Sequence, residues 1–209
     1  MSGLPAGTAP DELLTLLGSR RSGPDRDGTA PDDVQLAAIL AAATTVPDHG
    51  GLRPWRFVVV RAEGRQRFGD ALVAGLVGER GPDLPGSVLA KMRGKALAAP
   101  AQIVLIASPR AGSNVPVWEQ VASASCTGFA VVLAATALGL GAVWKSAAVL
   151  HTDPVRAFFG AGADEQLLGW INVGTAVGEG VADRPVPELG ELVTVVEAGP
   201  AEPFVAPEG

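Results

Sequence analysis

The sequence has little cysteine, histidine, lysine and tyrosine, and each shortage excludes or narrows something. The single cysteine, Cys126, excludes an intramolecular disulfide framework and a cysteine-based metal cluster. With only two histidines, His49 and His151, a histidine-rich metal site is not expected, so no metal ligands are predicted. Tyrosine is absent and three lysines stand against thirteen arginines. We ascribe this bias to genome composition, but it makes each lysine worth locating.

Charged residues are also scarce, at 18% of 209 positions, while 47% are hydrophobic. A surface so poor in charge indicates extra buried area, either an oligomer interface or a bound cofactor. The net charge of −6 argues against a nucleic-acid binder, which usually carries a basic face. The N-terminus lacks a basic segment followed by an apolar run, so no secretory signal is predicted and a cytoplasmic location is expected.

One long uncharged run, residues 121–142, could in principle cross a bilayer. It is dominated by Ala, Gly, Ser and Thr and has no flanking basic cluster, so no membrane contact is expected. The run predicts a central helix that begins near Pro116 and ends near Gly139 or Gly141. Its small side chains would let another helix approach closely, and Cys126 is expected in the core.

Hydrophobic patterning and turn residues predict the remaining elements. Helices are expected at 11–19, 31–46, 63–78, 87–97 and 152–160, and strands at 55–61, 101–108, 142–148 and 165–177. There are no repeats and no change of composition, so a single α+β domain is predicted over 1–209. Short arms are expected at about 1–10 and about 178–209, and the second contains a strand-like run, "ELVTVVEA".

Most standard catalytic motifs are missing from the sequence, including the Walker loop, HExxH, GxSxG and a GxGxxG fingerprint after a strand. One remaining candidate is "SRRSG", which places Arg20, Arg21 and Ser22 at the exit of a helix. Two guanidinium groups and a hydroxyl can hold a phosphate, although paired arginines are more often simply solvated.

Two further candidates combine a basic residue with small or hydroxyl-bearing neighbours. "VWKSA" places Lys145 and Ser146 beside Trp144 at a strand end, and Lys145 is the only lysine outside the surface-like helix of Lys91 and Lys95. "DHGGLRPW" offers His49, Arg53 and backbone donors beside glycines, where a planar ligand could lie against the main chain. Taken alone, a Lys–Ser pair is usually surface and a loop histidine usually has no function.

The order of these candidates resembles the FMN-dependent nitroreductase family. "RRS" follows the first helix, a loop ending in "RPWRF" enters the first strand, "WEQ" opens the long helix, and "GLGAVWKSA" and "LLGWINVGTA" come after it. The sequence is most similar to the short, single-domain branch of NAD(P)H nitroreductases, whose loop reads "APDHxxxxPW". The resemblance runs from about Leu13 to Ala176.

The resemblance implies a nitroreductase-like α+β fold, with a central, mostly antiparallel sheet flanked by helices. It also implies a homodimer with two FMN sites at the subunit interface. Arg20, Arg21 and Ser22 would hold the ribityl phosphate of FMN, joined by Lys145 and Ser146.

Further residues and segments take roles from the same resemblance. Trp144 would lie beside the cofactor, and Thr45 and His49 would reach the flavin from the partner subunit. The C-terminal arms, including "ELVTVVEA", would exchange between subunits and wrap the partner.

The chain departs from the family at two positions. Many members carry Lys or Arg near the pyrimidine edge of the flavin where this chain has Pro24. Many carry an asparagine where this chain has Gly51, although the short branch also lacks it. These departures bear on how the reduced flavin is stabilised, and therefore on its redox potential.

The resemblance implies a ping-pong reaction in which NADH or NADPH gives a hydride to the flavin and a small-molecule acceptor then takes the electrons. Nitroaromatics, quinones and activated alkenes are the acceptors it suggests. The cofactor carries the chemistry, so binding residues are predicted and no catalytic one. Two alternatives stay open: a flavin or deazaflavin carrier with little turnover, and a structural dimer that has lost its ligand.

Overall fold

The computed structural model describes residues 10–20, 23, 28–176, 187–196, 200 and 202–205. The chain divides into two units, residues 1–178 and 179–209. The first contains the central sheet and the helices packed on it, and the second is a short C-terminal unit.

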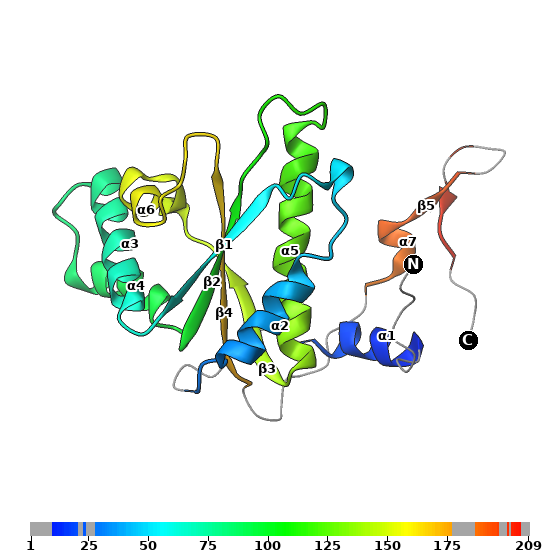
Figure 1. The fold of residues 1–209 in the computed structure, drawn as a ribbon, viewed down its shortest axis with the longest axis horizontal. Helices are drawn as coiled ribbons and strands as arrows, with labels where there is room; N and C mark the ends of the chain where they lie inside the picture. The colour runs from blue at the N-terminus through cyan, green and yellow to red at the C-terminus, as the bar shows by residue number, and fades with distance from the viewer. Residues whose placement is uncertain are drawn as a thin grey trace. The chain divides into compact units, whose positions relative to one another are not determined.

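The sheet of the first unit has four antiparallel strands in the order β1-β2-β4-β3 (Figure 1). They are β1 (Trp55–Arg61), β2 (Ala101–Ala107), β3 (Leu140–Lys145) and β4 (Gln166–Thr175). Every residue of β2 is buried, as its continuous apolar run predicts for a central strand covered on both faces. All four expected strands are present, and β3 begins two residues earlier than predicted.

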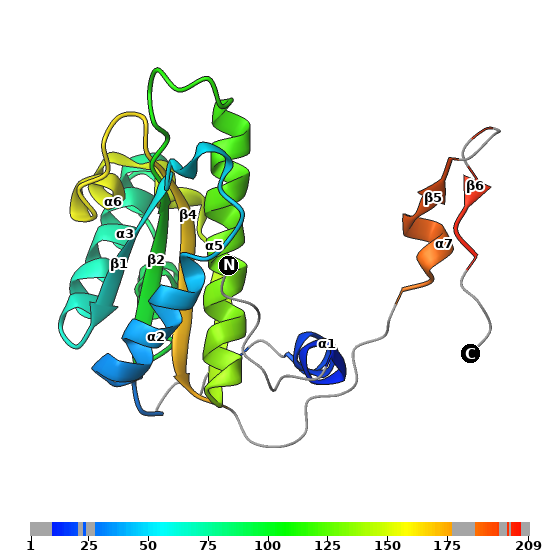
Figure 2. The ribbon, with the colours of Figure 1, turned by 45° about the vertical axis from the view of Figure 1, so that its right-hand side comes forward.

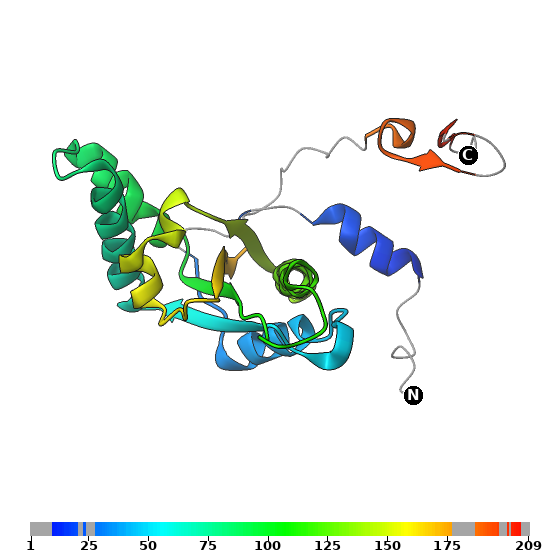
Figure 3. The ribbon, with the colours of Figure 1, turned by 90° about the horizontal axis from the view of Figure 1, so that it is seen from above.

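One face of the sheet is covered by α2 (Asp33–Ala43) and α5 (Val117–Ala137), seen with α5 end-on in Figure 3. The N-terminus of α2 carries the capping box that its sequence indicates: Gln35 N–H donates to Asp32 Oδ1 at 2.7 Å, and Asp32 N–H donates to Gln35 Oε1 at 3.1 Å. Alternate residues of β2, including Ile103 and Leu105, point into this layer of the core.

The opposite face is covered by α3 (Gly64–Arg80), α4 (Gly86–Ala96) and α6 (Asp153–Phe158). Figures 1 and 2 show the sheet between the two helical layers. The other alternate residues of β2, Val104 and Ile106, pack here, together with Trp170 of β4. Phe68 lies edge-on to the indole of Trp170, with ring centroids 5.3 Å apart.

Helix α5 is long and apolar enough to cross a membrane, but 44% of its most apolar stretch is buried within the fold. It packs against α2 and the sheet, as predicted for a central helix. The expectation for Cys126 is wrong, because its position on α5 faces away from the sheet and is exposed. Phe129, Val117 and Trp118 of the same helix are exposed as well.

The remaining elements are short. Helix α1 (Pro10–Ser19) contacts α5, and the one-turn helices η1 (His49–Gly51) and η2 (Ala148–His151) lie in loops. The C-terminal unit holds α7 (Leu189–Leu192) and the strands β5 (Thr194–Val195) and β6 (Glu202–Pro203). The run "ELVTVVEA" is not one strand, because its first two residues end α7. Of its described residues, Thr194 and Val195 pair with β6 of the same chain.

Candidate functional site

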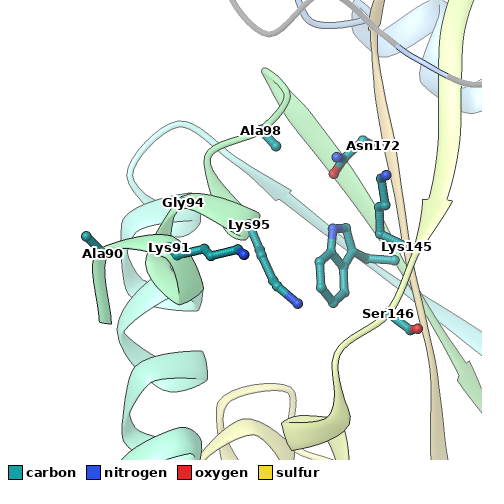
Figure 4. Close-up of a pocket in the computed structure, with 9 residues that line it drawn as sticks. Ala90, Lys91, Gly94, Lys95, Ala98, Lys145, Ser146 and Asn172 are labelled. Atoms are coloured by element: carbon teal, nitrogen blue, oxygen red, sulfur yellow. The ribbon is translucent and has the colours of Figure 1, made fainter. Parts of the chain in front are cut away.

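A cavity of about 520 Å³ lies between α4, the end of β3 and the middle of β4 (Figure 4). Its volume is in the range typical of small-molecule and cofactor sites, about 300–1,000 Å³. The cavity contains all three lysines of the chain. The lining residues are Ala90, Lys91, Gly94, Lys95, Ala98, Lys145, Ser146, Trp170 and Asn172.

Helix α4 supplies two of the lysines from one face. Lys91 and Lys95 are four residues apart, so their side chains project from the same side of the helix. Ala90, Gly94 and Ala98 line the same wall, and their small size leaves room for a ligand. The expectation that this is simply a surface helix is corrected: Lys95 is half-buried and both lysines point into the cavity (Figure 4).

Strand β3 supplies the third lysine, Lys145. Successive side chains of a strand point to opposite faces, so the direction of Lys145 follows from that of Trp144. The indole of Trp144 packs in the core layer under α5, and its Nε1 donates to the carbonyl of Leu168 on β4 at 3.1 Å. Lys145, the next residue, therefore points to the α4 face and lines the cavity, as does Ser146. The structure brings these two predicted residues together with α4, while the ring of Trp144 does not line the cavity.

Two buried polar side chains of β4 face the same cavity. The Nε1 of Trp170 and the Oδ1 of Asn172 are buried and have no hydrogen-bond partner among the described residues. A buried donor or acceptor left unpaired costs about 1–3 kcal/mol, so both atoms favour a ligand that pairs with them. Sequence reasoning missed both residues, although an asparagine inside the apolar strand "LLGWINVGT" was a usable signal.

The positive charges of the three lysines are not paired with carboxylates in the described part of the chain. None of the three lysines has a carboxylate within 4.0 Å there, whereas the neighbouring Arg93 pairs with Asp70 at 2.8 Å. The whole chain carries a net charge of −6. All three lysines of this acidic protein therefore lie around one cavity, and none is paired with a carboxylate of the described residues. The cavity is a candidate site for an anionic ligand.

The first predicted phosphate motif is only partly described. Arg20 directly follows α1, and its backbone N–H donates to Leu16 O at 3.1 Å. Arg21, Ser22 and Pro24 lie outside the described residues. Between them, Gly23 donates its N–H to Ala142 O at 3.4 Å, so the chain that follows α1 reaches β3 three residues before Lys145.

Thr45 and His49 do not line the lysine cavity of their own chain. The Thr45 hydroxyl donates to Ala42 O at 2.8 Å, at the C-terminal end of α2. His49 Nδ1 lies 2.7 Å from Glu119 Oε1 on α5, and His49 and Glu119 line a separate hollow of about 260 Å³ that also includes Cys126. Within one chain, these two predicted residues and the lysines belong to different places.

The loop between α2 and β1 is held in an unusual backbone conformation. Gly50 and Gly51 have φ values of 76° and 63°, in the left-handed region that glycine enters without strain. Arg53 follows with φ 47°, a value that costs a residue with a Cβ, and its N–H donates to Asp48 Oδ2 at 2.7 Å. The conformation of this loop, by itself, accounts for the glycine pair.

The largest pKa shift in the described part of the chain belongs to Glu165, which does not line the lysine cavity. Glu165 accepts two hydrogen bonds from Arg56 on β1, each 2.7 Å long. These bonds, with a further one from the Gly162 N–H, outweigh burial and lower the pKa of Glu165 to about 2. The pair fastens the segment before β4 to β1.

No group of three or more histidine, cysteine or acidic residues suited to a metal ion occurs within the described ranges. The cationic and hydrogen-bonding groups that converge in the cavity suit an anionic ligand.

Comparison with known proteins agrees with this geometry. A sequence model of the nitroreductase family matches residues 18–175. The Escherichia coli K12 protein named "Putative NAD(P)H nitroreductase YdjA" is 34% identical over 183 residues, which is 88% of this chain and 98% of that protein.

Solved structures resemble the chain over most of its length. A nitroreductase-like family protein from Bacillus cereus has a TM-score of 0.74 at 23% identity, covering 92% of this chain and all of that one. The FMN-dependent nitroreductase NfnB from Mycobacterium smegmatis, solved with NADPH, has a TM-score of 0.68 at 19% identity, covering 88% and 98%. The predicted fold, an antiparallel sheet flanked by helices, is confirmed.

Proposed function

Because the chain belongs to the nitroreductase family, we propose that it is an FMN-dependent oxidoreductase that uses NADH or NADPH to reduce small electrophilic acceptors such as nitroaromatics and quinones. The observation that carries the proposal is the convergence of all three lysines, including the Lys145–Ser146 pair, on one cavity. When bound there, FMN would accept a hydride from the nicotinamide and pass two electrons to the acceptor.

The residues of the cavity fit the parts of FMN. The phosphate group is an anion, and Lys145 and Ser146 offer a charge and a hydroxyl at the end of β3. The contact between Gly23 and β3 supports the prediction that Arg20, Arg21 and Ser22 join them at the phosphate. The flavin ring carries both an N–H donor and carbonyl acceptors, which match the unpaired Oδ1 of Asn172 and Nε1 of Trp170.

Lys95 would compensate for the departure at Pro24. Reduced flavin is anionic, and a lysine at its pyrimidine edge, absent here because of Pro24, would have stabilised it. Lys95 projects into the cavity from α4, half-buried and without an ion-pair partner in the described structure. A cation at this position would stabilise the anionic reduced flavin, and the stabilisation would be larger because little solvent screens the two charges.

We also propose that the chain works as a homodimer, with Thr45 and His49 of each subunit contributing to the flavin site of the other. The exposed apolar side chains support this: α5 presents Val117, Trp118 and Phe129, and α1 presents Leu13 and Leu14. The C-terminal unit exposes Leu192, Val196 and Val205, and a unit so small gains stability by packing on another surface. The exchange of this unit between subunits is part of the proposal.

The visible absorption spectrum of the purified protein tests the function. We expect flavin bands that bleach when NADPH or NADH is added without oxygen and that return when a nitroaromatic or a quinone follows. Flavin bands that neither nucleotide bleaches would favour the cofactor carrier instead. A protein that takes up no FMN, even when FMN is supplied, would contradict the proposal.

A further inference from the structure

Lys91 has a different position in the cavity from the other two lysines. Lys95 is half-buried, one turn further along α4, and Lys145 is on the opposite wall (Figure 4). Lys91 is exposed, yet its side chain points into the cavity and not away from it (Figure 4). An exposed cation directed into a site lies where a ligand that enters and leaves can meet it.

The local surroundings of Lys91 give it no role in stabilising the fold. Two lysines four residues apart repel each other and destabilise a helix by about 0.2–0.5 kcal/mol. The nearby Arg93 has a carboxylate partner, Asp70, at 2.8 Å. Within the described residues Lys91 has no carboxylate of its own, so its ammonium group is free to bind an anion from solution.

The proposed cofactor does not need this third lysine for its phosphate. Lys145 and Ser146 would hold that group, and Lys95 would face the ring system. Lys91 is then available to bind the second molecule that enters the site, the one that exchanges electrons with the flavin. Because the chain as a whole repels small anions with a net charge of −6, a local cation has a large effect on which of them can enter.

We propose that Lys91 determines acceptor specificity, and that the acceptors favoured by this enzyme carry a carboxylate or a similar anionic group, as a nitrobenzoate does. The inference rests on the proposed function. For such an acceptor the balanced reaction is Ar–NO₂ + NADPH + H⁺ → Ar–NO + NADP⁺ + H₂O, in which one nicotinamide is oxidised, the nitro group loses one oxygen as water and one proton comes from solvent. Lys91 pairs with the carboxylate, which takes no part in the electron transfer.

A matched pair of acceptors separates charge from shape. 4-Nitrobenzoate and 4-nitrobenzamide differ mainly in one charge, and both can be titrated into the oxidised, FMN-loaded protein without any electron donor. Perturbation of the flavin absorption bands then gives a dissociation constant for each. We expect the wild-type protein to bind the carboxylate about tenfold more tightly than the amide, the effect of one charge-assisted contact at a partly exposed site.

Variants on α4 assign the preference to Lys91. In Lys91→Met the ratio of the two dissociation constants should fall to about one, while Lys91→Arg should restore most of the preference. Arg93→Met removes a charge two residues away that faces Asp70 and does not line the cavity, and it should keep the wild-type ratio. The ratio of kcat/KM for the same two acceptors, with NADPH as donor, should follow the same order.

Three results would overturn the inference. A carboxylate preference that persists in Lys91→Met would place the anion elsewhere, and loss of FMN from that variant would make Lys91 part of the cofactor site. If Lys91→Met changed kcat/KM for NADPH relative to NADH and left the acceptor ratio unchanged, the anion would belong to the electron donor. Failure of the proposed function is distinguishable, because a wild-type protein without flavin bands fails before any acceptor is added.

Discussion

The indole ring of Trp144 lies directly against Gly128 of α5. A Cβ built on Gly128 would lie 2.6 Å from two ring carbons of Trp144 and 2.9 Å from a methyl carbon of Leu105. Only a residue without a side chain allows this approach of helix to sheet. Because the ring occupies the α5 face of β3, the alternation of the strand sends Lys145 to the α4 face and into the cavity.

Substitution Gly128→Ala should therefore destabilise the protein. The added methyl group overpacks the contact with Trp144, at a cost of about 1–3 kcal/mol, more than the helix gains from alanine. Urea denaturation measures the change in the free energy of unfolding. Gly78→Ala on α3 is the matched control, because nothing lies within 4 Å of its Cβ, and it should be neutral or stabilising. Equal stability of the two variants would show that the Trp144 ring moves freely.

The sequence predicted those parts of the fold that depend on local pattern. The continuous apolar run of β2 predicts a strand that is buried on both faces. The uncharged run of small residues in α5 predicts a central helix. Lys145 and Ser146 could be selected because lysine is scarce and because the motif "GLGAVWKSA" resembles the family.

The other wall of the site could not be read from local pattern. Lys91 and Lys95 have the spacing of an ordinary solvated helix face, and only the placement of α4 over β4 turns that face toward a cavity. The positions of Asn172 and Trp170 depend on which face of β4 each residue takes. The pairing of β2 with β4 also shifts register between Leu105 and Ile106, opposite Gly169 and Leu167. Such tertiary relationships join segments about 80 residues apart in the chain, beyond the range of helix and strand periodicity.

Substitution Lys145→Met should weaken FMN binding. Removing one charge-assisted hydrogen bond to a phosphate costs about 1.5–3 kcal/mol, which corresponds to an affinity lower by roughly 10- to 150-fold. Titration of the FMN-free protein, followed by quenching of free FMN fluorescence, gives the dissociation constant. Arg61→Met removes an exposed cation that pairs with Asp33 and should leave FMN affinity at the wild-type value. Equal affinities in both variants would exclude Lys145 from the phosphate site.

The ion pair between Arg56 and Glu165 predicts a pH dependence of stability. The folded protein holds the pKa of Glu165 at about 2, below its ordinary value of 4.5, so the carboxylate stabilises the fold fully above pH 4.5 and loses this effect as the pH falls toward 2. Glu165→Gln should cost on the order of 1–2 kcal/mol at pH 7, since Arg56 is partly exposed and solvent screens the pair.

Denaturation of both proteins at a series of pH values isolates this contribution. Other carboxylates titrate in the same range but do so in both proteins, so the difference in unfolding free energy between wild type and Glu165→Gln reports on Glu165 alone. That difference should be constant from pH 7 to 5 and should shrink between pH 4.5 and 2.5. A difference that stays the same at every pH would mean that the ion pair adds no net stability.

A dimer that shares its sites predicts complementation between two defective subunits. Lys145→Met and His49→Ala should each weaken FMN binding at both sites of a homodimer. In a mixed dimer of one subunit of each kind, one site receives both substitutions and the other receives neither, if Lys145 and His49 come from different subunits. The mixed dimer should then bind one FMN with wild-type affinity and the second far more weakly.

Differently tagged subunits, co-expressed and purified through both tags, supply the mixed dimer, and its FMN stoichiometry decides the question. If His49 and Lys145 served the same subunit's site, each site would keep one substitution and both would bind weakly. The positions of the two residues within one chain already favour the first result, since His49 is held by Glu119 at 2.7 Å in a hollow that contains none of the lysines. Co-purification of no mixed dimer at all would contradict the proposed assembly itself.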